Sequence, residues 1–205
     1  LCILGDNPAA AFPGGKQAAK ALEQLDFLVV QDAFLTETAK QADVVLPWAV
    51  YAEKDGSFTS AERRVQRVKK AMTAPGGAQS ALWTIQELAH RMGQTWEVST
   101  PEAVLHEIAS ASSAYAGLHL NRLAPNGLFW PCPETDHPGT PMLYEQNFPS
   151  GRGSFHPAPQ PASPDSASSD YPFLVITGPA VEHDQTGTLS RYCSGLRKVT
   201  PQPQV

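Results

Sequence analysis

Short apolar runs alternate with amphipathic stretches in the first half of the chain. The runs at 1–4, 27–30 and 44–46 are continuously apolar. The runs at 27–30 and 44–46 are typical of buried strands in a parallel sheet. Apolar residues at helical spacing predict helices between and after these strands, at 18–25, 36–41, 82–92 and 102–109. Alternating strands and helices with short turns indicate an α/β fold, with an open, mostly parallel sheet and flanking helices.

Proline divides this regular first part from the rest. Of the 19 prolines, 11 lie between Pro125 and Pro172. Residues 156–170 are rich in Pro, Ser and Ala, and this composition predicts a surface linker. The apolar stretch 171–177 that follows predicts a strand at the start of a second domain. The chain is therefore predicted to hold one α/β domain, a linker and the beginning of another domain.

Composition excludes several classes of protein. A net charge of −5 argues against a general nucleic-acid binder held by phosphate contacts. No apolar run approaches the ~20 residues that a membrane-spanning helix needs. The three cysteines, Cys2, Cys132 and Cys193, are odd in number and far apart, so they fit neither a disulfide framework nor a C-x-x-C metal site. The cytoplasm is the default expectation for the compartment.

Polar residues follow two of the predicted strands directly. The turn at 5–8 contains Asn7, and Gln31 and Asp32 come directly after the second run. In parallel sheets, ligands bind beyond the carboxyl ends of the strands, where an Asn amide or an Asp carboxylate can contact them. The structural alternatives are an Asx turn at Asn7 and helix capping by Asp32 or Thr36.

Two further loops offer groups for a polar ligand. Lys54 lies in the loop 53–59, ahead of a basic run through Lys70 that a solvated charged face would also explain. The loop after the last predicted strand offers hydroxyls, a His and glycine backbone N–H groups, which suit a polar ring or a diphosphate. The alternative for this second loop is an ordinary hairpin with a surface His. Its candidate residues are Thr177, Gly178, His183, Thr186, Gly187 and Thr188.

Metal and thiol chemistry have little support in the sequence. The histidines His106, His119, His137 and His156 have no ligating partners at suitable spacing, so we expect no metal ligands among them. Cys132 is predicted to be a buried structural thiol rather than a reactive one.

Four ordered motifs resemble one family. The stretch 30–47, which contains Gln-Asp-Ala-Phe-Leu-Thr-Glu-Thr, and the stretch 53–66, Glu-Lys-Asp-Gly-Ser-Phe-Thr-Ser-Ala-Glu-Arg-Arg-Val-Gln, are similar to the molybdopterin oxidoreductases. The stretch 130–141, which begins Trp-Pro-Cys-Pro, resembles formate dehydrogenase alpha subunits in particular. Thr-Gly at 177–178 and Glu-His at 182–183 resemble the loop that opens the family's C-terminal domain.

The resemblance implies a domain plan. Residues 1–118 would form an α/β dinucleotide-binding domain, and 119–170 a loop-rich connection with the Pro/Ser linker. Residues 171–205 would begin a C-terminal β-barrel domain. The cofactor would be a bis-molybdopterin guanine dinucleotide with molybdenum, or with tungsten. A 4Fe-4S cluster and the Cys or selenocysteine metal ligand would lie upstream of this segment, so the segment alone would be inactive.

The resemblance also implies roles for single residues. Asn7 would contact the dinucleotide, Gln31 and Asp32 would contact its guanosine, and Lys54 its polar portion. The residues of the C-terminal loop would cover the pterin or its diphosphate, and these are Thr177, Gly178, His183, Thr186, Gly187 and Thr188. The chain departs from the family pattern at Ser60, Ala81 and Pro179, and after His183.

The implied activity is oxidation of formate to carbon dioxide, with two electrons passed through the metal and an iron–sulfur cluster to an electron-carrier protein or redox subunit. Two alternatives stay open at this point. One is the catalytic subunit of an assimilatory-type nitrate reductase, with nitrate as substrate. The other is a non-catalytic iron–sulfur scaffold relative. None of these readings includes a nucleic-acid partner or a membrane segment.

Overall fold

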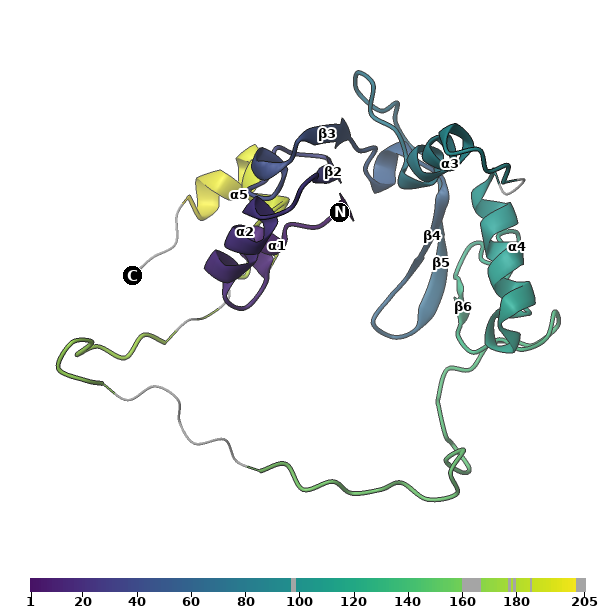
Figure 1. The fold of residues 1–205 in the computed structure, drawn as a ribbon. Helices are drawn as coiled ribbons and strands as arrows, with labels where there is room; N and C mark the ends of the chain where they lie inside the picture. Colours follow the sequence, from purple (N-terminus) through teal and green to yellow (C-terminus); the bar gives the residue numbers. More distant parts are fainter. Residues whose placement is uncertain (97–98, 160–166, 177, 179, 185, 202–205) are drawn as a thin grey trace. The chain divides into compact units, whose positions relative to one another are not determined.

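The computed structural model describes residues 1–96, 99–159, 167–176, 178, 180–184 and 186–201 (Figure 1). The chain forms two compact units, Leu1–Pro141 and Met142–Val205. The first unit contains two small sheets with their helices, and the second has little regular structure in its described part. Among the described residues, no helix is both long and apolar enough to span a membrane.

The N-terminal part of the first unit is a three-stranded parallel sheet. Its strands are β1 (Cys2–Leu4), β2 (Val29–Asp32) and β3 (Val44–Pro47), in the order β1-β2-β3. Leu4 pairs with Gln31, which in turn pairs with Leu46. The parallel α/β organisation predicted from the apolar runs is confirmed, and β2 is its central strand.

Helices cover one face of this sheet. They are α1 (Pro8–Ala11), α2 (Gly15–Glu23) and the short 3-10 helix η1 (Ala39–Gln41). Leu22 of α2 packs with Leu28 and Val30, which are 1% and 0% exposed. Ile3 and Ala9 join the same apolar cluster, so β1 and α1 are anchored there as well.

Two local predictions in this part are wrong. The segment 44–46 was expected to be a buried strand, but Val44 and Val45 of β3 are 38% and 41% exposed, because β3 is an edge strand of the described sheet. The segment 36–41 was expected to be a helix, but only η1 forms there. Thr36 and Thr38 are both fully buried, and their hydroxyls bond to groups outside a helical ladder.

The second sheet is antiparallel and was missed by the sequence patterns. Its strands are β4 (Gly56–Thr59), β5 (Arg64–Val68) and β6 (Leu128–Phe129), in that order. Only Val65 of β5 is fully buried, so the strand carries a weak apolar signal. Its partner β6 lies far along the chain, which no local pattern reveals.

The interpretation of the basic run as a solvated face is wrong for its first two arginines. Arg63 has a left-handed backbone, with φ of 67°, and turns the hairpin between β4 and β5. Its guanidinium donates to the backbone carbonyls of Trp130, Thr140 and Pro141. Arg64 lies 4.2 Å from the centroid of the Phe129 ring. These arginines therefore hold the segment 126–141 against the hairpin.

Helices α3 (Ala81–Arg91) and α4 (Pro101–Ala111) confirm the two predictions made from helical spacing. Each begins at a side-chain cap, because the hydroxyls of Ser80 and Thr100 accept backbone N–H groups of the first turn. Short 3-10 helices follow β3 and α4, namely η2 (Tyr51–Glu53) and η3 (Ser113–Tyr115).

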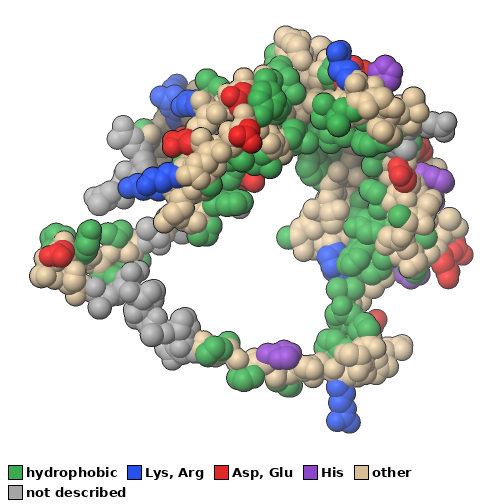
Figure 2. Space-filling view, viewed as in Figure 1, with side chains coloured by type: hydrophobic (Ala, Val, Ile, Leu, Met, Phe, Trp, Pro, Cys, Tyr) green, Lys and Arg blue, Asp and Glu red, His purple; other side chains and the backbone are tan. Residues whose placement is uncertain are grey.

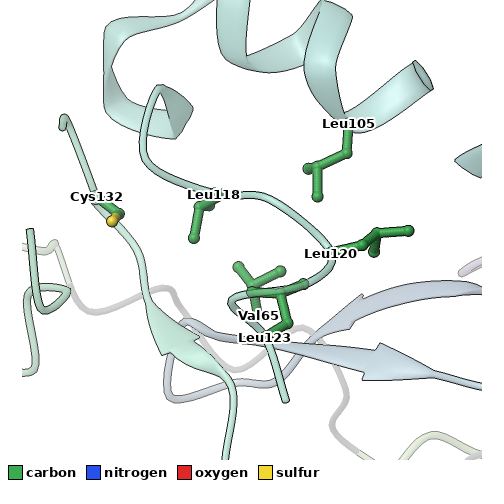
Figure 3. Packing of buried hydrophobic residues seen from close by; sticks show 6 residues of the cluster. All are labelled: Val65, Leu105, Leu118, Leu120, Leu123 and Cys132. Carbon is green, nitrogen blue, oxygen red and sulfur yellow. The ribbon is translucent and has the colours of Figure 1, made fainter. Parts of the chain in front are cut away.

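A second apolar core joins α4, β5 and the segment after η3. Figure 3 shows the side chains of this cluster, and its members are Val65, Leu105, Leu118, Leu120, Leu123 and Cys132. Cys132 is 0% exposed, which confirms the expectation of a buried structural thiol. The first compact unit therefore extends through residues 119–141, although the domain bounds 1–118, 119–170 and 171–205 stay predictions.

The described part of the second unit contains the 3-10 helix η4 (Ser190–Tyr192) and the helix α5 (Ser194–Val199). The strand predicted over 171–177 does not form in residues 171–176, and Thr177 lies outside the described residues. Phe173 and Ile176 are 85% and 89% exposed, so this apolar stretch has no packing partner in the described chain. The C-terminal barrel and the linker stay predictions.

Candidate functional site

The carboxyl ends of the three parallel strands meet at one edge of the sheet. The Gly5 N–H donates to the Gln31 carbonyl over 2.8 Å, and the Trp48 N–H donates to the Asp32 carbonyl over 3.1 Å. Gly5 turns the chain after β1 with φ of 64°. This is the place in an open α/β sheet where ligands bind, and we name it the carboxyl edge: Gly5, Asn7, Gln31, Asp32 and Trp48.

Gln31 lies at the centre of the carboxyl edge and is 0% exposed. Its Nε2 donates to the Thr84 hydroxyl over 2.8 Å and to the Gln79 carbonyl over 3.2 Å. Its Oε1 has no hydrogen-bond partner among the described residues. A buried acceptor without a donor is unusual in a folded protein, and it makes Gln31 a candidate for contact with a ligand.

Asp32 points to the opposite face of β2, because neighbouring residues of a strand alternate. Its Oδ1 accepts the Ala33 N–H over 2.6 Å, and its Oδ2 accepts the Thr36 hydroxyl over 3.5 Å. Burial raises the pKa of this carboxyl, although the Ala33 N–H acts in the other direction. Asp32 therefore stabilises the turn that follows it, as the capping alternative from the sequence also proposes. It does not share a face of the strand with Gln31.

Asn7 is 2% exposed and connects the turns after β1 and β2. Its Oδ1 accepts the Thr38 hydroxyl over 2.8 Å and the Thr38 N–H over 3.1 Å. Its Nδ2 donates to Glu37 Oε2 over 2.8 Å. In this structure the Asn7 amide holds the shape of the carboxyl edge.

Trp48 was not singled out in the sequence, although it directly follows the strand-ending Pro47. Its ring packs on the backbone of Gly5, where an added Cβ would lie 1.4 Å from a ring carbon. Lys54 Nζ lies 4.8 Å from the centroid of the same ring. The buried Trp48 Nε1 has no hydrogen-bond partner among the described residues.

Lys54 is thereby placed beside the carboxyl edge through Trp48, and burial lowers the pKa of its ammonium group. Lys54 also lines an open groove of about 680 Å³ between the β4–β5 hairpin and helices α3 and α4. The groove is lined by polar and apolar side chains, among them Lys54, Lys70, Phe58, Trp83, Leu105 and Ile108. Figure 2 shows the Lys and Arg side chains of the visible face in small separate groups.

The candidates near the C-terminus form a loop of the second unit. His183 bonds through Nδ1 to the Ser190 hydroxyl over 3.1 Å and through Nε2 to the Thr200 carbonyl over 2.9 Å. The hydroxyls of Thr186 and Thr188 lie 2.8 Å apart, and Gly187 between them has φ of 69°. Gly178 is exposed, whereas Thr177 and Pro179 lie outside the described residues.

No set of three or more His, Cys, Asp or Glu side chains gathers to hold a metal ion within the described ranges.

Residues 1–91 match the family model described as molybdopterin oxidoreductase. Residues 1–91 belong to the molybdopterin oxidoreductase family. The match contains the whole parallel sheet, the carboxyl edge, Lys54 and helix α3. The resemblance of the motifs at 30–47 and 53–66 to this family is therefore confirmed.

Curated relatives resemble nearly the whole chain. F420-dependent formate dehydrogenase subunit alpha of Methanocaldococcus jannaschii is 42% identical over 99% of this chain and 31% of its own length. F420-dependent formate dehydrogenase 2 subunit alpha of Methanococcus maripaludis is 42% identical over 96% of this chain and 30% of its own length. The assimilatory nitrate reductase catalytic subunit of Bacillus subtilis is 34% identical over 96% of this chain and 29% of its own length. The chain thus spans about a third of the length of these relatives.

One solved structure also overlaps the chain. Acetylene hydratase from Pelobacter acetylenicus covers 71% of this chain and 24% of its own chain, with a TM-score of 0.47 and 19% sequence identity. The family assignment does not depend on this overlap.

The family implies a molybdopterin cofactor, and the carboxyl edge fits such a group. Gln31 Oε1 and Trp48 Nε1 are an acceptor and a donor that the described residues leave unmatched. Gly5 has no side chain, and this leaves room for the Trp48 ring at the edge. The edge therefore has both a hydrogen-bond donor and a hydrogen-bond acceptor for a polar ring system.

Proposed function

We propose that this chain is the cofactor-holding part of a molybdenum oxidoreductase that oxidises formate. The observation that carries the proposal is 42% identity, over nearly the whole chain, to two formate dehydrogenase alpha subunits. The nitrate reductase subunit of Bacillus subtilis is 34% identical over a similar share. The unmatched polar atoms at the carboxyl edge support a cofactor-binding role for the chain.

The cofactor in this proposal is a bis-molybdopterin guanine dinucleotide with molybdenum, or with tungsten. Gln31 Oε1 would accept a hydrogen bond from its ring system, and Lys54 would attract its anionic portion. Asn7 and Asp32 would keep the turns around it in place through the bonds described above. Gly178, His183 and the segment 186–188, with Thr177, would cover the pterin from the C-terminal domain.

In the whole enzyme, formate would lose two electrons and one proton and leave as carbon dioxide. The bound metal centre supplies the two-electron acceptor for this reaction. A 4Fe-4S cluster would carry the electrons to a redox partner protein, and the proposed compartment is the cytoplasm. The residues of this chain bind and orient the cofactor rather than touch formate.

The test is to produce the full-length protein in a host that inserts the cofactor. We expect about one metal ion and released GMP after acid hydrolysis, together with formate-dependent reduction of an artificial electron acceptor. Nitrate reduction without formate oxidation would identify the protein as a nitrate reductase instead. A well-folded protein without metal or GMP would identify a non-catalytic scaffold and overturn the proposal.

A further inference from the structure

We propose that Trp48 is a cofactor-binding residue, which acts with Gln31 to recognise the 2-amino-4-oxopyrimidine edge that guanine and pterin share. This inference rests on the proposed function, because it needs the molybdopterin dinucleotide as ligand. It adds a hydrogen-bond donor that neither the motifs nor the spacing of the sequence indicated.

The position of Trp48 connects the parts of the carboxyl edge. Its backbone is bonded to the end of the central strand β2 through the Asp32 carbonyl. Its ring reaches Gly5 at the end of β1, on the far side of β2. Its other neighbour is the ammonium group of Lys54. The indole therefore lies across the end of the central strand, where a ligand of an α/β sheet is held.

Two polar atoms at this edge lack a hydrogen-bond partner in the described chain, and one is a donor whereas the other is an acceptor. Trp48 Nε1 can only donate, and Gln31 Oε1 can only accept. The orientation of the Gln31 amide is fixed, because the Gln79 carbonyl can only accept and so must face Nε2. A buried polar group without a partner destabilises the fold. A ligand that makes hydrogen bonds to both atoms would remove this cost, and the gain would add to its binding free energy.

The two atoms also come from the same side of the sheet. Gln31 pairs with Leu46, and the extended chain continues to Trp48, two residues further, which forms a parallel bridge with Gln79. Residues two apart in an extended strand point to the same face. Nε2 of Gln31 donates to the carbonyl of the same Gln79. The Gln31 side chain and the Trp48 backbone are therefore both neighbours of Gln79.

The chemistry of the unmatched pair selects the class of ligand. Guanine and pterin both present a carbonyl oxygen next to a ring N–H on one edge. The Trp48 indole N–H would donate to that carbonyl, and Gln31 Oε1 would accept the ring N–H. A phosphate has no N–H to give, so it would leave Gln31 Oε1 unmatched. The geometry therefore favours a ring edge over a diphosphate at this position.

Trp130 provides a matched control within the same chain. Its Nε1 is also buried without a partner among the described residues. Its ring packs 5.9 Å from that of Tyr115, beside the second apolar core and away from the carboxyl edge. Phe at either position removes an unmatched N–H and keeps an aromatic ring. The two substitutions are therefore chemically the same and differ only in their location in the fold.

The experiment measures how fast the full-length holoenzyme loses its cofactor in dilute urea, through the fluorescence of the released oxidised pterin. We expect Trp48→Phe to lose it about five- to tenfold faster than the wild type, as one hydrogen bond to the ligand predicts. Trp130→Phe should stay within about twofold, by the same reasoning. Both cofactor-free variants should unfold at the wild-type temperature or above it.

The outcomes separate the two proposals. A wild-type protein without bound pterin overturns the proposed function, and the role of Trp48 with it. Cofactor loss from Trp48→Phe at the wild-type rate overturns the role of Trp48 alone. Equal acceleration in Trp48→Phe and Trp130→Phe also overturns it, because the effect would then come from general destabilisation.

A second arm tells the two rings apart. Cofactor-free wild type and Trp48→Phe are titrated with GMP and, separately, with a free pterin, and the unfolding temperature is measured. Loss of the stabilisation by GMP in Trp48→Phe places guanine at this edge, and loss of the stabilisation by pterin places the pterin there. Stabilisation of both proteins by both compounds to the same extent contradicts the proposal.

Discussion

Gly5 and Trp48 depend on each other. Gly5 has a left-handed backbone, and the Trp48 ring fills the space that a side chain would need. Each feature alone disfavours any other residue at position 5. Because both apply, adding a single methyl group at position 5 should destabilise the carboxyl edge.

Gly5→Ala is therefore expected to reduce the free energy of unfolding by about 2–4 kcal/mol, from backbone strain and from the collision with the ring. In a Trp48→Ala background only the strain remains, so the same change should cost about 1–2 kcal/mol. Urea denaturation of the four proteins of this double-mutant cycle measures the difference. Equal effects in both backgrounds would contradict the contact between Gly5 and Trp48.

Asp32 makes the stability of the fold depend on pH. Burial raises its pKa in the folded protein above the unfolded value, so the fold favours the neutral carboxyl. The contribution of Asp32 is thus fully present below the unfolded pKa and is lost as the pH rises through the folded pKa.

Asp32→Asn should accordingly raise the unfolding temperature at pH 7 and have a smaller effect near pH 3, where the wild-type carboxyl is neutral in both states. The amide keeps an oxygen to accept the Ala33 N–H. Thermal unfolding of both proteins at the two pH values is the measurement. A variant that is less stable than the wild type at pH 7 would show that the charge of Asp32 supports the fold.

At the scale of elements, Arg63 connects the hairpin β4–β5 to the segment 130–141. The Arg63 guanidinium donates to three backbone carbonyls of the segment 130–141. Planar guanidinium groups make several directed bonds at once, which a lysine does not reproduce. This explains why a basic run that resembles a solvated surface is part of the fold.

Arg63→Ala should therefore lower the free energy of unfolding by about 2–4 kcal/mol, because several carbonyls lose a charged donor. Arg63→Lys should recover less than half of this loss. Arg67→Ala is the control, since Arg67 is exposed on the same hairpin and should change stability by less than about 0.5 kcal/mol. Urea denaturation compares the three variants, and a neutral Arg63→Ala would contradict the anchoring role.

At the scale of the whole molecule, we propose that the chain supplies part of the cofactor cradle and that the reaction centre lies in other parts of the full-length protein. It spans about a third of the length of its formate dehydrogenase relatives. In the proposed function, the unmatched Gln31 and Trp48 atoms at the carboxyl edge would contact the organic part of the cofactor. The metal ligand and the iron–sulfur cysteines are expected in other parts of the full-length protein.

Residues 1–205, produced alone, should consequently show no formate-dependent reduction of an electron acceptor, whereas the full-length protein should show it. Identical expression conditions and assays for metal, pterin and activity make the comparison direct. Activity in the isolated segment would place the metal-binding residues within these 205 positions and overturn the cradle interpretation.

The sequence alone determined those features whose signals are local. The turn after β1 and the helices α3 and α4 were predictable, because glycine, capping hydroxyls and helical spacing act within a few residues. The parallel sheet was predictable from its apolar runs. The motifs indicated the family because their order and spacing can be read from the sequence without knowing which residues are in contact.

Tertiary structure decided what depends on residues far apart in the chain. The pairing of β5 with β6 and the bonds of Arg63 join segments that no local pattern connects. Gln31 and Asp32 looked equivalent in sequence, yet the strand sends them to opposite faces and different partners. Trp48 gained its place only because folding brings Gly5, Asp32 and Lys54 around it.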